Sequence, residues 1–205
     1  REYRGVVGNV TVTSEIERCI EVAVESFGGL DILVSNAGSF PPSVSIEDCD
    51  DSFWAETLEL NLTSHKKLLR AATPYLRLGW EPSVVLIGSK NVPAPGPGVS
   101  PYSVAKAGLT QLGRVAALEL GSDGIRVNTI HPNAVFDTGI WEGDIVAKRA
   151  ANYGITPSEY RTRNVLGVEI TSADVAAMVL AILGPGFSRT TGAQIPIDGG
   201  NERVI

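Results

Sequence analysis

The sequence predicts an α/β fold in which helices cover both faces of a doubly wound parallel sheet. Short unbroken runs of valine, isoleucine and leucine alternate along the chain with longer segments of helical periodicity. Strands that lack polar alternation are typical of parallel sheets buried on both sides. The chain has 205 residues, of which 43% are hydrophobic, enough for a sizeable core. We therefore interpret residues 1–205 as a single domain.

The predicted strands are the apolar runs, and loops rich in glycine, proline or polar residues follow them. They cover residues 30–34, 83–88, 125–130 and 194–197. The predicted helices cover about 15–27, 52–78, 102–120 and 171–184, and residues 131–170 are irregular. In open α/β sheets, ligands bind at the carboxyl ends of the strands. We therefore expect a functional site among the loops that begin at Asn36, Ser89 and His131.

Composition and charge exclude several classes of function. A formal net charge of -6 argues against a protein that binds the nucleic-acid backbone, because such proteins are normally basic. Cys19 and Cys49 lack metal-type spacing, so no metal site is expected. The longest apolar run, residues 175–183, is too short to cross a membrane. Two thiols without a disulfide pattern favour a reducing compartment, and a cytoplasmic location is expected.

Tyr102 and Lys106 form the sharpest local motif. Residues four apart lie on one face of a helix. A lysine ammonium near a phenol stabilises the phenolate, so the tyrosine pKa, about 10 when unperturbed, is expected to fall toward neutrality. Tyr102 would then be a usable general acid or base. Taken alone, however, the motif is as compatible with an ordinary helix as with catalysis.

Polar residues elsewhere strengthen the catalytic interpretation. Ser89 lies 13 residues before Tyr102, at the end of a predicted strand. Asn61 lies in an apolar stretch of a predicted helix, where a buried amide needs hydrogen-bonding partners. The turn Asn36-Ala37-Gly38 follows another strand. Hydroxyl and amide groups at strand ends are suited to orienting a substrate oxygen.

These residues resemble the short-chain dehydrogenase/reductase family in their order and spacing, from about Gly8 to the end of the chain. Residues 124–132 and the segments Thr191-Gly192 and Ile197-Asp198-Gly199-Gly200 agree with the same pattern. The resemblance implies a Rossmann-like fold. It also implies an oxidoreductase that transfers a hydride between NAD, with NADP as the alternative, and a small alcohol, aldehyde or sugar-derived carbonyl compound.

The resemblance implies a role for each residue that matches. Tyr102 would be the acid/base, Lys106 would lower its pKa and bind the nicotinamide ribose, and Ser89 would orient the reacting oxygen. Asn61 would hold a water molecule of a proton relay. The implied cofactor-binding positions are Asn9, Val10, Asn36, Ala37, Gly38, Tyr102, Lys106, Pro132 and Thr138.

Some positions depart from the family pattern or allow two interpretations. Asn9 replaces the family's aspartate, and Thr138 lies six rather than five residues after Pro132. His131 is either a substrate contact or a strand-end histidine bonded to backbone. His65 is expected to be exposed or at a subunit contact. The aromatic residues Trp141 and Tyr153 either shape a substrate pocket, as in the family's lid region, or only pack.

One branch of the family resembles the chain more closely, on residues 88–102, 131–141 and 198–205. It is the dehydrogenase domain of bifunctional rhamnulose-phosphate aldolase/alcohol dehydrogenases. This resemblance implies lactaldehyde as the substrate and a role in rhamnose catabolism. The aldolase half is not in this sequence, so no aldolase activity is expected.

The family's glycine-rich turn is not found before Asn9. Because a βαβ unit takes about 30 residues, we expect an N-terminal truncation of roughly 50 to 60 residues that removes the first strands. The chain alone is then expected to bind NAD poorly and to expose an unpaired apolar edge. The alternative function is that of an impaired homologue acting as a binding or assembly module. The helices at 52–78 and 102–120 match the family's subunit contact, which implies a homodimer or homotetramer.

Overall fold

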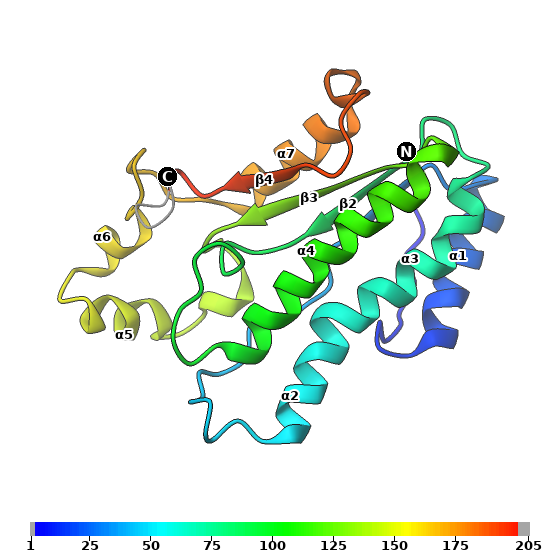
Figure 1. Ribbon diagram of the computed structural model, residues 1–205. Coiled ribbons are helices and arrows are strands. Elements are labelled where there is room, and N and C mark those ends of the chain that lie inside the picture. Colours follow the sequence, from blue (N-terminus) through cyan, green and yellow to red (C-terminus); the bar gives the residue numbers. More distant parts are fainter. Residues whose placement is uncertain (1–2, 201–205) are drawn as a thin grey trace.

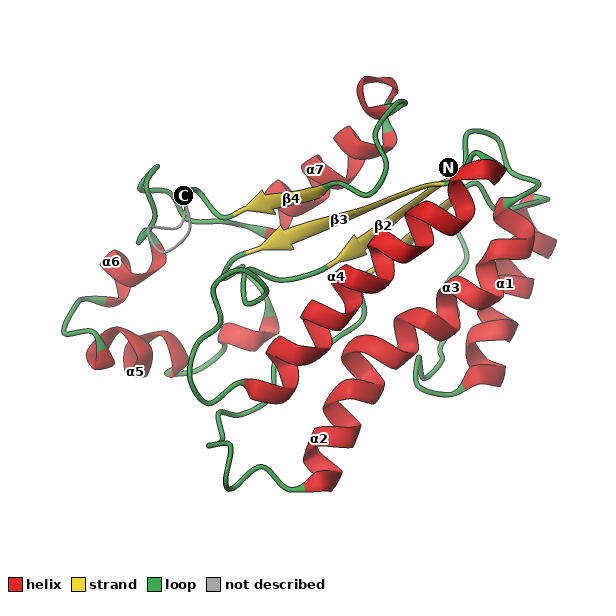
Figure 2. Ribbon diagram, in the orientation of Figure 1, coloured by secondary structure: helices red, strands yellow, loops and turns green. Residues whose placement is uncertain are grey.

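The computed structural model describes residues 3–200, which contain a four-stranded parallel sheet with the strands in chain order (Figures 1 and 2). All four predicted strands are confirmed, with ends that differ by no more than two residues. The resemblance noted at residues 201–205 lies outside the described part. The strands are β1 (Ile32–Ser35), β2 (Ser83–Ile87), β3 (Arg126–Pro132) and β4 (Gln194–Ile197).

Helices cover both faces of this sheet, which confirms the predicted α/β fold class. Figure 2 shows long helices packed on one face of the sheet and a further helix on the other. Those on the first face are α1 (Thr13–Phe27), α3 (Ser64–Leu76) and α4 (Ser100–Leu120), and α7 (Ser172–Leu183) lies on the second. Within residues 3–200, no helix combines the length and the apolar character that crossing a membrane requires.

The core lies on both sides of β2, whose five residues are all buried. Successive side chains of a strand point to opposite faces. Val84 and Leu86 accordingly join the cluster beneath α3 and α4, whereas Val85 and Ile87 pack with Ile182 of α7. This two-sided burial explains why the strand reads as an unbroken apolar run. Each fully buried aliphatic side chain of this kind contributes about 1.5–3 kcal/mol through the hydrophobic effect.

Strand β1 is covered on one face only. Leu33 and Ser35 are buried, whereas Ile32 and Val34 on the other face are 48% and 42% exposed. Within the described residues, β1 is also an edge strand, paired only with β2. The sheet thus presents apolar side chains at this edge, and the expected loss of further strands stays a prediction.

The long helix predicted at residues 52–78 is confirmed over residues 51–76, and it contains a π-helical turn that the sequence did not predict. It consists of α2 (Asp51–Leu58), a π-helical turn η1 (Glu59–Thr63) and α3. Asp50 caps α2, because its carboxylate accepts a hydrogen bond from the Phe53 amide at 2.8 Å. A π-helical turn inserted into an α-helix often marks a functional site. Here it contains Asn61.

The region that looked irregular in sequence contains short helices. These are the 3-10 turn Gly139–Trp141, α5 (Ile145–Asn152) and α6 (Pro157–Arg161). In Figure 1, α5 and α6 lie beyond the arrowheads of β3 and β4, at the carboxyl ends of the strands. Ligands bind at this end of open α/β sheets. Segment 136–163 is therefore placed to shape a ligand site.

Candidate active site

Four side chains that the sequence singled out converge at the carboxyl end of the sheet. Tyr102 lies in the first turn of α4 and Lys106 one turn later. Ser89 follows β2, and Asn61 comes from η1. Ser89 hydrogen-bonds the Tyr102 side chain, and the Lys106 ammonium is 5.9 Å from the centre of the Tyr102 ring. A cluster of a phenol, an amine and a hydroxyl can move a proton to or from a substrate oxygen.

Lys106 is buried, and its ammonium is anchored to the sheet. Nζ donates a hydrogen bond to the carbonyl oxygen of Ile87, the last residue of β2, at 2.8 Å. Burial lowers the pKa of this lysine to about 8, because removal from water disfavours the charged form. An ammonium has three N–H donors. The bond to Ile87 uses one of them.

Tyr102 differs from the sequence-based expectation. Burial raises the pKa of its phenol, and the hydrogen bond with Ser89 opposes this effect only in part. Phe40 packs edge-on against the ring, with 4.8 Å between the ring centroids, and contributes to the apolar surroundings. The expected fall in the Tyr102 pKa was therefore wrong for this structure, because loss of hydration outweighs any stabilisation of the phenolate.

Asn61 is fully buried, and both ends of its amide have partners. Nδ2 donates to the Thr57 carbonyl at 3.1 Å, and Oδ1 accepts from the Ser39 amide at 3.1 Å. The second bond ties the loop after β1 to the helix. A Cβ atom at Gly38 would lie 2.8 Å from the same Oδ1. The loop can therefore approach Asn61 only because residue 38 has no side chain.

We predict that Gly38→Ala destabilises the protein by about 1–3 kcal/mol, since the added methyl group must displace the Asn61 amide or the loop. Urea unfolding measures the change. Gly29→Ala is the matched control, because nothing lies within 4 Å of a Cβ atom there. Equal stability of the two variants would contradict the close approach.

His131 holds the backbone of Ser89. Its Nε2 lies 2.6 Å from the Gln194 side-chain oxygen, and its Nδ1 lies 3.2 Å from the Ser89 amide nitrogen and 3.0 Å from the Ser89 carbonyl oxygen. A Cβ atom at Gly88 would lie 2.6 Å from this Nδ1. Of the two interpretations of His131, the structure shows the backbone-bonded one. The glycine just before Ser89 is the only hint of this contact in the sequence.

Lys90 and Asp198 form a buried ion pair that the sequence did not predict. Lys90 is the residue after Ser89, and its amide donates to the Pro132 carbonyl at 2.9 Å. Asp198 follows β4 directly. The pair therefore fastens the Ser89 loop to the end of the neighbouring strands.

His65 is 1% exposed, so the expectation of an exposed or subunit-contact histidine was wrong. It lies on the face of α3 that packs on the sheet, and its Nδ1 is 2.6 Å from the Ser35 hydroxyl. Burial, and to a smaller extent the positive charge of Lys106, lower the pKa of His65 to about 4. The ring is therefore neutral at physiological pH.

We predict an acid-sensitive stability that originates in His65. The ordinary pKa of this side chain is 6.5, and its folded value is about 4. Between these values the unfolded chain binds a proton that the folded chain does not, so stability falls as pH falls, by about 3 kcal/mol in total. Urea unfolding at pH 7.0 and at pH 4.5 should show a smaller difference for His65→Gln than for the unsubstituted protein. The same difference in both proteins would rule this origin out.

The positions expected to bind a cofactor fall into two groups. Asn36, Ala37 and Gly38 form an exposed turn at the end of β1, above Asn61 and Lys106. Within residues 3–200, no hydrogen bond joins the second group to the Tyr102 cluster. Before α1, the Asn9 side chain accepts hydrogen bonds from Thr11, and Val10 beside it is half-buried. The Pro132 carbonyl accepts a hydrogen bond from the Lys90 amide. The Thr138 hydroxyl donates to the Val135 carbonyl at 2.8 Å.

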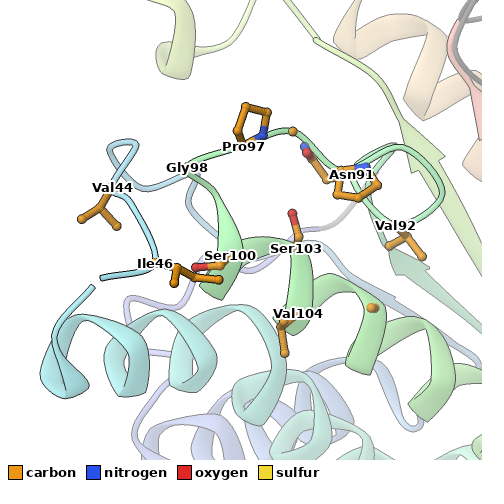
Figure 3. A pocket seen from close by; sticks show the side chains of 12 residues that line it. Val44, Ile46, Asn91, Val92, Pro97, Gly98, Ser100, Ser103 and Val104 are labelled. Atoms are coloured by element: carbon orange, nitrogen blue, oxygen red, sulfur yellow. The ribbon is translucent and has the colours of Figure 1, made fainter. Parts of the chain in front are cut away.

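Residues 3–200 contain no group of three or more histidine, cysteine, aspartate or glutamate side chains that could hold a metal ion. A cavity of about 550 Å³ lies between loop 91–98, the loop before α2 and the start of α4 (Figure 3). Ser103 points into it from α4. None of the four catalytic candidates lines this cavity, so we do not assign it to the reacting substrate.

Comparison with known proteins places the fold and the site in context. Residues 2–202 match the family model described as enoyl-(acyl carrier protein) reductase. An uncharacterized oxidoreductase of Bacillus subtilis, YuxG, is 34% identical over 200 residues, which is 94% of this chain and 29% of that protein. Human dehydrogenase/reductase SDR family member 4 is 36% identical over 140 residues, which is 67% of this chain and 50% of that protein.

A crystal structure of a dehydrogenase/reductase from Sinorhizobium meliloti superposes with a TM-score of 0.82 at 33% identity, over 94% of this chain and 72% of that one. The chain spans less than two thirds of the length of the two curated relatives. The family model nevertheless matches nearly all of the chain, and the parallel sheet superposes on that of a solved relative. The chain therefore belongs to the short-chain dehydrogenase/reductase family.

Proposed function

We propose that this protein transfers a hydride between a nicotinamide cofactor and a small alcohol or the corresponding carbonyl compound. The observation that carries the proposal is the convergence of Tyr102, Ser89 and Lys106 at the carboxyl end of a parallel sheet. Membership of an oxidoreductase family supports it.

Tyr102 moves the proton in this proposal. In the reducing direction its phenol donates a proton to the carbonyl oxygen, which becomes a hydroxyl as the carbon gains the hydride. In the oxidising direction its phenolate takes the hydroxyl proton, and the C=O bond forms as the C–H bond breaks. Ser89, which already hydrogen-bonds Tyr102, orients the same substrate oxygen. Asn61 holds the loop that borders the site.

The residues present fit a nicotinamide ribose. Lys106 has two N–H donors beyond the one that bonds Ile87, and they can hold ribose hydroxyls. The missing side chain at Gly38 leaves room beside them, since a Cβ atom there would lie 3.6 Å from Nζ. When bound, the nicotinamide supplies or accepts the hydride. We propose NAD as the cofactor, with Asn9, Val10, Asn36, Ala37, Pro132 and Thr138 as further contacts, and NADP as the alternative for the test.

The substrate and the assembly state are part of the same proposal. Resemblance to the dehydrogenase domain of rhamnulose-phosphate aldolase fusions supports lactaldehyde, and with it a role in rhamnose catabolism in the cytoplasm. The outer face of α4 supports a homodimer or homotetramer, because Val104, Val115 and Leu118 are 47%, 39% and 84% exposed there. Exposed apolar side chains on a helix face are typical of subunit contacts.

Hydride transfer can be tested directly with the full gene product. A secondary alcohol deuterated at the carbinol carbon is incubated with NAD or NADP, and the reduced nicotinamide is analysed by mass spectrometry. We expect deuterium on the nicotinamide ring. Deuterium released to water, or no reduction with either cofactor by a protein that remains oligomeric, would favour the binding or assembly module instead.

A further inference from the structure

The guanidinium of Arg149 lies between two aromatic rings. Its central carbon is 5.2 Å from the centre of the Phe40 ring and 5.0 Å from the centre of the Trp141 ring. Arg149 comes from the last turn of α5, Trp141 from a 3-10 turn, and Phe40 from the loop after β1. The loop after β1 therefore meets two neighbouring elements of segment 139–152 at one positive charge.

Stacking orients this charge without neutralising it. A guanidinium uses its faces to stack on rings, and its five N–H donors lie in its plane and remain available. Within residues 3–200, Arg149 has no ion pair and no hydrogen bond through its side chain. The nearby Arg161, in contrast, pairs with Glu169 at 2.8 Å. The N–H donors in the plane of the half-buried Arg149 guanidinium are thus held in place and remain available to a ligand.

Phe40 connects this cation to the site of proton transfer. Its ring packs edge-on against Tyr102, with a centroid distance of 4.8 Å and an interplanar angle of 68°. The loop that carries Phe40 is held by the bond from Ser39 to Asn61. One aromatic ring therefore separates the guanidinium from the catalytic phenol. The centroid distances of 4.8 Å and 5.2 Å bound the separation between the Arg149 carbon and the centre of the Tyr102 ring at about 10 Å. A small molecule whose oxygen is held by Tyr102 and Ser89 can extend its far end toward Arg149.

The basic side chains near Arg149 differ from it in having acidic partners. Lys148 pairs with Asp144, and Arg161 pairs with Glu169. The charge of Arg149 can therefore attract an anionic ligand at the border of the site. Planar guanidinium donors match the two oxygens of a carboxylate or phosphate.

We propose that Arg149 forms an anion-binding subsite, so that the substrate is a small hydroxy or oxo compound with a carboxylate or phosphate group. The inference rests on the proposed function for the reacting end of the substrate. It narrows the proposed substrates to anionic compounds. Lactaldehyde is neutral, so its kcat/KM becomes the reference value that an anionic substrate must exceed. The stacked rings fix the guanidinium so that binding the anion costs little side-chain entropy.

Matched substrates test the subsite with the full gene product and its reduced nicotinamide cofactor. Acetoacetate is compared with butan-2-one, and dihydroxyacetone phosphate with dihydroxyacetone, with lactaldehyde as a further neutral substrate. We expect kcat/KM to favour the anionic member of at least one pair by about 10- to 100-fold, the range for a charge-assisted hydrogen bond. The two pairs distinguish a carboxylate from a phosphate.

Substitutions separate the subsite from a structural role. Arg149→Met should lower the ratio of anionic to neutral kcat/KM to near one, mainly through KM, and Arg149→Lys should restore part of it. Lys148→Met is the matched control, because it removes the same charge from the same helix at an exposed side chain. Its ratio should stay unchanged. An equal loss for both members of a pair in Arg149→Met, or a neutral substrate preferred by the unsubstituted protein, would overturn the subsite.

A binding readout keeps the two proposals apart. Malonate and inorganic phosphate are titrated while tryptophan fluorescence is followed, with Trp141→Phe to identify the signal beside Arg149. We expect saturable binding that Arg149→Met abolishes and Lys148→Met retains. Such binding without turnover of any substrate would retain the subsite and contradict the oxidoreductase. Turnover without any anion binding that depends on Arg149 would retain the oxidoreductase and contradict the subsite.

Discussion

Replacing Tyr102 with phenylalanine is expected to reduce kcat by about 10²- to 10⁴-fold, the usual contribution of a positioned general acid or base. The variant keeps the ring that packs on Phe40 and removes only the hydroxyl that bonds Ser89. Stability should change little, so the loss belongs to chemistry. Steady-state turnover in both directions measures it, alongside urea unfolding of the same samples.

Tyr75→Phe is the matched control, since it removes the same atom from a partly buried tyrosine of α3 that packs against the core. It should leave kcat unchanged. Substantial turnover by Tyr102→Phe would contradict the assignment. The raised pKa of Tyr102 adds a second signature. Oxidation needs the phenolate, so its rate should rise with pH, whereas reduction needs the phenol and should not rise.

Asp198→Asn is expected to cost about 3–5 kcal/mol of unfolding free energy, because it leaves the Lys90 charge buried without its partner. Lys90 is 4% exposed and Asp198 7% exposed, so water cannot replace the lost interaction. The change should also reduce turnover, since Lys90 adjoins Ser89. Urea unfolding measures the stability, and the exposed pair of Lys148 and Asp144 is the comparison.

The double variant Lys90→Met/Asp198→Leu identifies the cause of that loss. Replacing both members of a buried pair with apolar side chains is often neutral. We therefore expect the double variant to recover most of the stability that Asp198→Asn loses. If the double variant were no more stable than Asp198→Asn, packing rather than an uncompensated charge would account for the effect.

The sheet could be predicted from sequence because its determinants are local. The residues of β2 are apolar on both faces, and that pattern alone excludes a half-exposed strand. The spacing of Tyr102 and Lys106 likewise places them on one helix face without knowledge of the fold. The candidate Ser89 could be found because it follows a predicted strand and precedes Tyr102 by 13 residues, and Asn61 because it is a polar residue in an apolar stretch.

Other features depend on contacts between distant segments and left no local pattern. Burial of His65 depends on which face of α3 meets β1, and the partner of Lys90 lies 108 residues away. The Tyr102 pKa depends on hydration, which spacing does not reveal. The stacking of Arg149 required α5 to fold back on the loop after β1. Trp141 was weighed as a pocket residue, but its cationic neighbour could not be anticipated.

The π-helical turn at residues 59–63 determines how far α3 is rotated about the helix axis relative to α2. Within it, Asn61 faces the loop after β1, and after it, α3 directs His65 and Leu69 to the sheet. Each residue in an α-helix turns the chain by about 100°, so deleting one residue here would bring the two halves into a single phase. Only one of the two faces could then keep its target. The turn thus acts as an inserted spacer that lets a contact with the loop after β1 and a contact with the core coexist on one continuous helix.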